Sequence, residues 1–316
     1  MKYDTARKVV IIGAGLVGMS YAYALLNQGA CDEIALIDID KRRAEGEAMD
    51  LNHGIAFAPK DMKIYAGDYR ECQDARIVVI TAGVSQKKGE SRLDLLSRNA
   101  SIIKSIVGEV MKNGFSGILL VGTNPVDILT YVAYKESGLP SKRVIGTGTS
   151  LDSARLRYLL SSYLKIDSRN IHANIIGEHG DSEFPLWGSA NIGTKLLSDV
   201  VAEHKEYNSS DLEQIFSEVR NAAYNIIERK KSTYYAIGMV LCHITKAIFN
   251  DSNSIIPLSV YINDFFGVKD LYIGMPAVIN SEGIREIVKI NMTKAEQEKF
   301  VHSATILKDS LNQLNF

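Results

Sequence analysis

The sequence has few cysteines, almost no net charge and no long apolar run. Its three cysteines, Cys31, Cys72 and Cys242, are widely spaced and odd in number. This spacing argues against a disulfide framework or a zinc site and fits free thiols in a reducing compartment. The formal net charge of −1 argues against a broad nucleic-acid or membrane surface. We therefore expect no metal, no nucleic-acid partner and no membrane partner.

Targeting and repeat signals are also missing from the 316 residues. No segment has the length and apolarity of a membrane-spanning helix, and no repeat occurs at solenoid periods. Residues 1–8 lead directly into a strand-like run, so we expect no secretory signal and a cytoplasmic location. The apolar fraction of 46% and the charged fraction of 23% are ordinary for a globular protein that is long enough for two domains.

A glycine-rich turn lies between the first strand-like run, KVVII at residues 8–12, and a helical segment that begins near Met19. The turn is GAGLVG (residues 13–18), and the amides at such a helix start can hold a pyrophosphate. The next strand ends in Asp38, 20 residues after Gly18, where a carboxylate can accept both ribose hydroxyls of NAD. The alternative is a tight turn with an incidental acid, and the combination favours a cofactor site.

Strands and helices alternate through the rest of the first half. We expect strands at 33–37, 76–81, 117–121 and 143–146, and helices near 41–53, 92–112 and 126–138. This alternation predicts an α/β fold with a doubly wound parallel (Rossmann) sheet, whose ligand site lies at the carboxyl ends of the strands. The residues at those ends should line one crevice: Gly13, Asp38, Thr81, Ala82, Gly83 and Asn124.

The second half has a different pattern, which predicts an α+β lobe. A helix capped by Ser150 should carry Asp152 and Arg155 on one face, with Arg157 pointing elsewhere. Further helices are expected at 209–230 and 234–249, then antiparallel strands near 255–263 and 276–279. A last helix, about 293–314, should be capped by Thr293. The predicted domains are residues 1–147, which bind the dinucleotide, and 148–316, which bind the substrate.

His179 follows the apolar, strand-like run 171–176 and lies between two glycines in IIGEHGDSE. Imidazole can give and take a proton near neutral pH, and the glycines can present it to a cleft. A lone histidine of this kind is more often part of a surface turn, so its weight comes from the other motifs. Residues 83–92 (GVSQKKGESR) are either a solvated loop or a lid that closes over a ligand.

The motifs together resemble those of bacterial-type L-lactate dehydrogenases in the lactate/malate dehydrogenase family. The resemblance runs from Val9 to the C-terminal helix and rests on GAGLVG with Asp38, ITAGVSQKKGESR, GTNPVD, LDSARLR, IIGEHGDSE and STYYAIG. It implies an NAD-dependent oxidoreductase of glycolysis and fermentation that reversibly reduces pyruvate to L-lactate. It also implies a homotetramer.

The resemblance assigns roles by position. His179 is the expected acid/base, Asp152 its partner, Arg92 the cation that polarises the carbonyl, and Arg155 the clamp on the substrate carboxylate. Asn124 and Thr233 are expected to bind substrate. The expected cofactor-binding residues are Gly13, Gly15, Leu16, Val17, Gly18, Asp38, Thr81, Ala82, Gly83 and Asn124.

Gln86 is the expected determinant of substrate choice. Malate dehydrogenases carry arginine at the matching position, where it meets a second carboxylate, whereas a neutral amide suits the methyl group of pyruvate. The alternatives are a malate dehydrogenase, a dehydrogenase for bulkier 2-hydroxy acids, or an NAD-binding regulatory protein that has lost catalysis.

Arg157 and His172 have no part in this chemistry. Spacing alone favours two ordinary surface residues. Many bacterial L-lactate dehydrogenases, however, bind fructose 1,6-bisphosphate with an arginine and a histidine at the matching positions. The resemblance therefore implies an allosteric effector site at a subunit interface.

Overall fold

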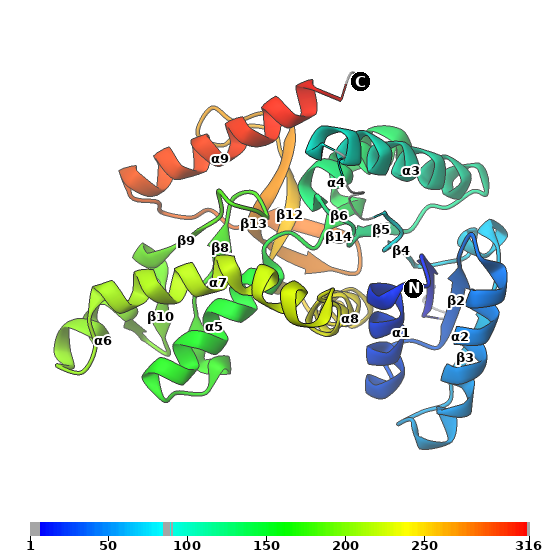
Figure 1. The fold of residues 1–316 in the computed structure, drawn as a ribbon, viewed down its shortest axis with the longest axis horizontal. Helices are drawn as coiled ribbons and strands as arrows, with labels where there is room; N and C mark the ends of the chain where they lie inside the picture. The colour runs from blue at the N-terminus through cyan, green and yellow to red at the C-terminus, as the bar shows by residue number, and fades with distance from the viewer. Residues whose placement is uncertain (1–6, 85–88, 90, 315–316) are drawn as a thin grey trace.

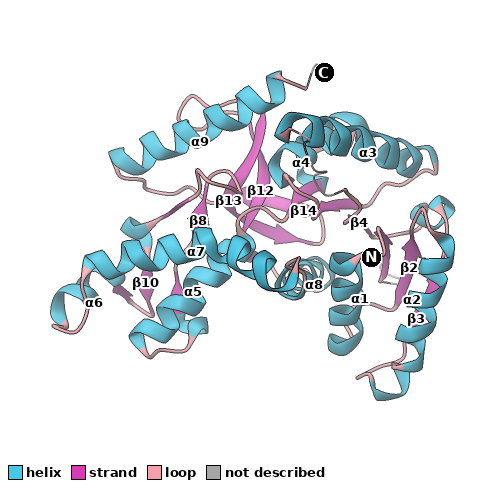
Figure 2. Ribbon diagram, viewed as in Figure 1, coloured by secondary structure: helices cyan, strands magenta, loops and turns pink. Residues whose placement is uncertain are grey.

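The computed structural model describes residues 7–84, 89 and 91–314. A single nine-stranded sheet runs through both halves, in the order β14-β13-β12-β6-β5-β4-β1-β2-β3 (Figures 1 and 2). Its first six strands are β1 Lys8–Ile12, β2 Glu33–Ile37, β3 Lys63–Ala66, β4 Ile77–Ile80, β5 Ile118–Val121 and β6 Val144–Gly146. All of them pair in parallel, which confirms the predicted Rossmann sheet. The observed strand order is 3-2-1-4-5-6, and β3 was not among the expected strands.

The strands of this sheet are apolar because helices cover both of its faces. Every residue of β1, β4 and β5 is buried. The covering helices are α1 Leu16–Gln28, α2 Lys41–His53, α3 Arg92–Lys112 and α4 Val126–Ser137. In Figure 1, α3 lies beside α4, and α1 lies beside α8 (Tyr235–Phe249) from the second half. Because α8 belongs to the second half and contacts α1, the second half packs directly on the first.

Three antiparallel strands of the second half extend the same sheet. They are β12 Ser254–Ile262, β13 Leu271–Asn280 and β14 Gly283–Ile287. The expected antiparallel pairing is confirmed, and β14 is a strand that the sequence pattern did not distinguish. Ser259 of β12 lies opposite Gly146 of β6, so the sheet continues across the expected boundary near residue 147.

Most of the remaining elements form a lobe around a second, smaller core. Its helices are α5 Ser150–Leu164, α6 Leu197–Glu203 and α7 Ser209–Lys230, and its short strands are β7 Ile171–His172, β8 Ile175–Ile176, β10 Asn191–Ile192 and β11 Lys195–Leu196. The strand β9 Phe184–Pro185 and the helix α9 Lys294–Asn312 pack instead on the main core, through Phe184 and Phe300. Short 3₁₀ turns are η1 Ile55–Phe57, η2 Tyr69–Cys72, η3 Ser141–Arg143, η4 Ser168–Asn170 and η5 Trp187–Ser189. Leu156 and Leu160 of α5 pack with Phe216 and Val219 of α7 in this core. Within the described ranges, no helix is both long and apolar enough to cross a bilayer.

Two local predictions need correction, and one is confirmed. Ser150 is not the cap of α5: the cap position is Thr149, and the Ser150 hydroxyl donates instead to the carbonyl of Pro257. The run 171–176 is not one strand, because β7 pairs with β10 while β8 pairs with β9 in a different sheet. Thr293 does cap α9, in a capping box with Glu296.

Candidate active site

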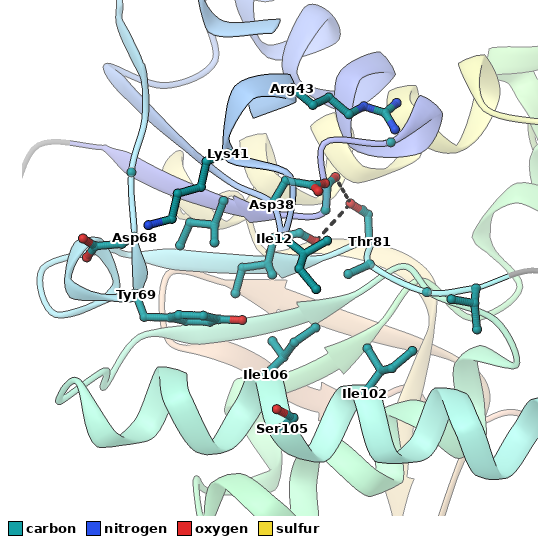
Figure 3. A pocket seen from close by; sticks show the side chains of 18 of the residues that line it. Ile12, Asp38, Lys41, Arg43, Asp68, Tyr69, Thr81, Ile102, Ser105 and Ile106 are labelled. Atoms are coloured by element: carbon teal, nitrogen blue, oxygen red, sulfur yellow. Dashed lines mark hydrogen bonds between the residues drawn. The ribbon is translucent and has the colours of Figure 1, made fainter. Parts of the chain in front are cut away.

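A crevice of about 990 Å³ opens at the carboxyl ends of the parallel strands (Figure 3). Six of the ten residues expected to bind the cofactor line it: Gly13, Gly15, Asp38, Thr81, Ala82 and Gly83. Leu16, Val17 and Gly18 belong to the first turn of α1 beside it, and Asn124 follows β5. The edge of the sheet and the start of α1 therefore meet at one site, as a bound dinucleotide requires.

Each glycine of the GAGLVG turn is required for a different structural reason. A Cβ atom on Gly13 would lie 2.5 Å from the amide nitrogen of Ala82, and Gly13 has a φ of +106°. A Cβ atom on Gly18 would lie 2.1 Å from the carbonyl oxygen of Gly13, so this glycine lets α1 approach the turn. A Cβ atom on Gly15, by contrast, would meet nothing within 4 Å. Gly15 faces open space at the start of α1, where a pyrophosphate would fit.

Asp38 is fixed at the end of β2 by two backbone amides. Its Oδ2 accepts from Ala14 N at 2.7 Å, and its Oδ1 accepts from Asp40 N at 2.9 Å. Thr81 donates through its hydroxyl to the carbonyl of Gly13 at 2.9 Å, which holds β4 against the glycine turn. The carboxylate is thereby fixed at the rim of the crevice, where ribose hydroxyls can reach it. The crevice fits the cofactor that the sequence predicts.

Other residues of this crevice were missed in the sequence. The inner face of α3 contributes Ile102, Ser105 and Ile106, which Figure 3 shows on the helix beneath the strand ends. Their i, i+3, i+4 spacing was readable as one helix face, but nothing in the sequence indicated which ligand part it would meet. The rim beyond Asp38 adds Ile39, Lys41, Arg43 and Tyr69.

The catalytic candidates converge at a second place, on the turn between β8 and β9. His179 Nδ1 lies 2.6 Å from Asp152 Oδ2, and Arg155 Nη1 donates to Asp152 Oδ1 at 2.9 Å. Asp152 is in the first turn of α5, where the helix dipole favours a negative charge. The predicted pairing of Asp152 with Arg155 and with His179 is thus present in the geometry. Nε2 is the ring nitrogen left for exchange of a proton.

Burial and charge act in opposite directions on this pair. Burial lowers the pKa of His179, but the nearby Asp152 carboxylate outweighs it and raises that pKa to about 9. Burial likewise works against ionisation of Asp152, yet His179 and Arg155 hold its pKa below the usual value. The structure therefore favours a protonated imidazole beside an ionised carboxylate.

Two acidic residues near His179 were quoted in the motifs but given no role. Asp127, in the first turn of α4, accepts the backbone amide of His179 at 2.8 Å and the hydroxyl of Ser259. Glu183, just before β9, is 5% exposed. One of its carboxylate oxygens lies within 4.8 Å of a carboxylate oxygen of Asp152 and a ring nitrogen of His179. The ligand atoms of these three residues are close enough together to hold a metal ion, but hydrogen bonds from His179 and Arg155 already occupy both oxygens of Asp152. Nothing in the sequence indicates that the fold of this turn brings Asp127 and Glu183 close to His179.

Some predicted residues are not joined to this pair by any described contact. Asn124 is exposed after β5, and Thr233 is half-buried between α7 and α8. Gln86 lies outside the described residues, and for Arg92 only the backbone, at the start of α3, is described.

The two candidate effector residues are neighbours in space. Arg157 donates to the carbonyl of Ala173 at 3.2 Å and to the side-chain oxygen of Asn174 at 3.1 Å, and His172 directly precedes Ala173. His172 is exposed on β7. Burial lowers the pKa of Arg157. Both of these hydrogen-bond partners are neutral, so no described acid neutralises the guanidinium there.

Comparison with known proteins agrees with this geometry. The lactate/malate dehydrogenase NAD-binding domain matches residues 7–146, and the α/β C-terminal domain of the same family matches residues 149–315. L-lactate dehydrogenase 2 of Bacillus cereus is 54% identical over 304 residues, which cover 96% of this chain and 97% of the relative.

Two solved structures are similar over almost their whole length. A lactate dehydrogenase from a Medee basin deep-sea metagenome library has a TM-score of 0.97 at 57% identity, covering 99% of this chain and 100% of the other. The minor L-lactate dehydrogenase from Enterococcus mundtii, in its ligands-bound form, has the same TM-score at 46% identity and the same coverage. The chain therefore belongs to the lactate/malate dehydrogenase family, and it is an NAD-dependent oxidoreductase of the L-lactate dehydrogenase type.

Proposed function

We propose that this L-lactate dehydrogenase reduces pyruvate reversibly with His179 as the proton donor. The observation that carries the proposal is the 2.6 Å contact between His179 Nδ1 and Asp152 Oδ2. The carboxylate stabilises the imidazolium and fixes its orientation, which leaves Nε2 to deliver the proton. NADH, when bound in the crevice beside Asp38, supplies the hydride.

The two arginines have different proposed tasks. Arg155 binds Asp152 through Nη1 alone among the described hydrogen bonds, so its other N–H groups can hold the substrate carboxylate. The substrate would then lie between the Arg155 guanidinium and the His179 ring. Arg92 is proposed to polarise the carbonyl, where negative charge grows during reduction. Asn124 and Thr233 are proposed to bind the substrate from the neighbouring segments.

Pyruvate is the proposed substrate because Gln86 is uncharged. Malate dehydrogenases need a cation at this position to meet a second carboxylate. The assay follows NADH consumption with pyruvate, oxaloacetate and 2-oxoisocaproate in parallel, on wild type and on Gln86→Arg. Wild type should prefer pyruvate, and the variant should shift toward oxaloacetate. A wild-type preference for oxaloacetate, or an unchanged ratio of kcat/KM for the two acids in Gln86→Arg, would show that Gln86 does not set the choice of substrate.

Arg157 and His172 are proposed to bind fructose 1,6-bisphosphate as an activator. The support is a guanidinium with neutral partners only a few ångströms from the segment that carries His172. Two such sets, brought together across a subunit interface of a homotetramer, would repel until a doubly charged ligand neutralised them. Pyruvate saturation with and without the effector tests this, with Arg157→Gln as the variant. An apparent KM that does not fall in wild type, or that falls equally in the variant, would exclude the effector site.

The division of labour within the chain is also a proposal. Residues 1–147 are proposed to bind the dinucleotide and residues 148–316 the substrate, in a cytoplasmic enzyme. Sedimentation at several protein concentrations would test the tetramer.

A further inference from the structure

Glu183 is a buried carboxyl group with no role in the mechanism described so far. The β8–β9 hairpin places it directly after the turn that carries His179, and Phe184 pairs with Ile176 to fix its backbone. A carboxylate oxygen of Glu183, a carboxylate oxygen of Asp152 and a ring nitrogen of His179 lie within 4.8 Å of one another, so the Glu183 side chain is directed toward the Asp152–His179 pair. Carboxyl groups that are only 5% exposed are normally paired with a cation or hold a proton.

The charges around Glu183 come from three elements. From α5, Asp152 and Arg155 face it, and from its own turn, His179 does. Asp127 on α4 accepts a hydrogen bond from the backbone amide of His179. Arg155 already donates to Asp152, and His179 donates to the other oxygen of the same carboxylate. No described cation therefore forms an ion pair with Glu183. Two adjacent buried carboxylates repel one another, so one of them retains its proton.

Asp152 is the member of this carboxyl pair that ionises. It has the two charge-assisted hydrogen bonds and the helix N-terminus, all of which favour its negative form. Among the described residues no cation is hydrogen-bonded to Glu183, whereas a carboxylate oxygen of Asp152 lies within 4.8 Å of it. That oxygen can accept a hydrogen bond from Glu183 only if Glu183 is protonated. Burial and the Asp152 charge accordingly raise the pKa of Glu183 to about 9.

We propose that Glu183 is a positioning residue of the reaction, whose carboxyl group stays neutral and donates its proton to the Asp152 carboxylate. His179 then faces one full negative charge instead of two. A second ionised carboxylate would hold the imidazole proton more tightly and make it a weaker acid toward pyruvate. The donated hydrogen bond also withdraws some negative charge from Asp152, so it lowers the proton affinity of His179.

Two substitutions separate the possible states of Glu183, because each state predicts a different direction. The readout is the apparent pKa of His179 in the pH profile of kcat/KM for pyruvate. Glu183→Gln keeps a neutral donor of nearly the same shape, so this pKa should stay within roughly 0.3 unit of wild type. Glu183→Leu removes the donor at similar volume, so the apparent pKa should rise by roughly half a unit or more.

The opposite results overturn the inference. If Glu183 is ionised, either substitution removes a negative charge, and the apparent pKa of His179 falls. If Glu183 only fills space, the pKa is unchanged in both variants. Asp181→Asn is the matched control, since it removes an exposed acid from the same turn. It should leave the apparent pKa of His179 where it is in wild type.

Two further observations keep the test decisive. Should Glu183→Leu fail to fold, infrared spectroscopy of wild type against Glu183→Gln at neutral pH still reports the state of Glu183. A protonated-carboxyl band that is present only in wild type supports the inference, and its absence rejects it. The inference rests on the proposed role of His179 as the acid, which fails separately if the same pH limb persists in His179→Gln.

Discussion

The backbone amide of His179 donates to Asp127 Oδ2 at 2.8 Å, which fixes the catalytic turn to the first turn of α4. The other oxygen of Asp127 accepts the hydroxyl of Ser259 on β12. One buried side chain therefore connects the helix after β5, the turn of His179 and the antiparallel part of the sheet. The position of the imidazole relative to the cofactor crevice depends on this connection.

Asp127 should make the stability of the protein depend on pH. Burial raises the pKa of Asp127 to about 6, above the value of an unfolded chain. The folded state therefore binds the proton more tightly, and stability is lost as pH rises from about 4 to about 6, by up to about 3 kcal/mol. Urea unfolding of wild type and Asp127→Asn should show a difference that changes over this range. A constant difference would contradict the assignment.

Removing the acceptor should be more damaging than neutralising it. Asp127→Asn can still accept from the His179 amide and donate to the Ser259 hydroxyl, whereas Asp127→Ala leaves the amide unpaired. We expect Asp127→Ala to lower the free energy of unfolding by about 1–3 kcal/mol relative to Asp127→Asn. It should also reduce kcat while leaving NADH binding, measured by fluorescence titration, nearly unchanged.

The His179–Asp152 pair should control the pH dependence of both reaction directions. Because the pKa of His179 is raised to about 9, kcat/KM for pyruvate should fall above that pH and kcat/KM for lactate should rise toward it. Asp152→Asn removes the charge that raises this pKa, so both limbs should move to lower pH.

His179→Gln should keep NADH binding and lose kcat on the order of 10²-fold or more. Near wild-type turnover in that variant would exclude the histidine.

Gly15 and Gly18 should respond differently to the same methyl group. A Cβ on Gly18 would collide with the carbonyl of Gly13, so Gly18→Ala should lower the melting temperature. A Cβ on Gly15 meets no protein atom within 4 Å, so Gly15→Ala should fold normally and bind NADH more weakly. Thermal unfolding without cofactor, followed by NADH titration, separates the two effects. Equal NADH affinity in Gly15→Ala and wild type would show that the pyrophosphate does not bind beside Gly15.

Asp38 should select NADH over NADPH. Its carboxylate would repel a 2′-phosphate, while Lys41 and Arg43 already line the same rim of the crevice. Asp38→Ser should therefore lower kcat/KM for NADH and raise it for NADPH. Adding Arg43→Gln should cancel the gain with NADPH, because it removes a cation that can meet the phosphate. If kcat/KM for NADPH is the same in the double variant and in Asp38→Ser, Arg43 does not bind the 2′-phosphate.

The sequence was most informative where one local pattern determines one element. The apolar runs of β1, β4 and β5 identified buried parallel strands, and the Thr293–Glu296 pair identified the start of α9. The spacing of Asp152 and Arg155 correctly placed them on one helix face. Each of these inferences needs only residues that are close along the chain.

Contacts between distant segments could not be read in the same way. Glu183 and Asp127 stood in quoted motifs, but their approach to His179 depends on how the β8–β9 turn folds against α4 and α5. Serine is a favoured N-cap residue, but the Ser150 hydroxyl donates to the carbonyl of Pro257. The sequence does not show that the fold brings this carbonyl close to Ser150. The split of 171–176 into two strands follows from pairing with β9 and β10, whose two-residue length gives no clear sequence signal.

The pairing of β12 with β6, opposite Gly146, has a consequence for any attempt to separate the two halves. Cutting the chain near residue 147 would expose the edge of β6 on one fragment and the edge of β12 on the other. Both are interior strands with apolar faces, so each fragment would offer an open template for pairing with foreign strands. Fragments made separately should aggregate, whereas fragments made together can cover each other's edges and reassemble.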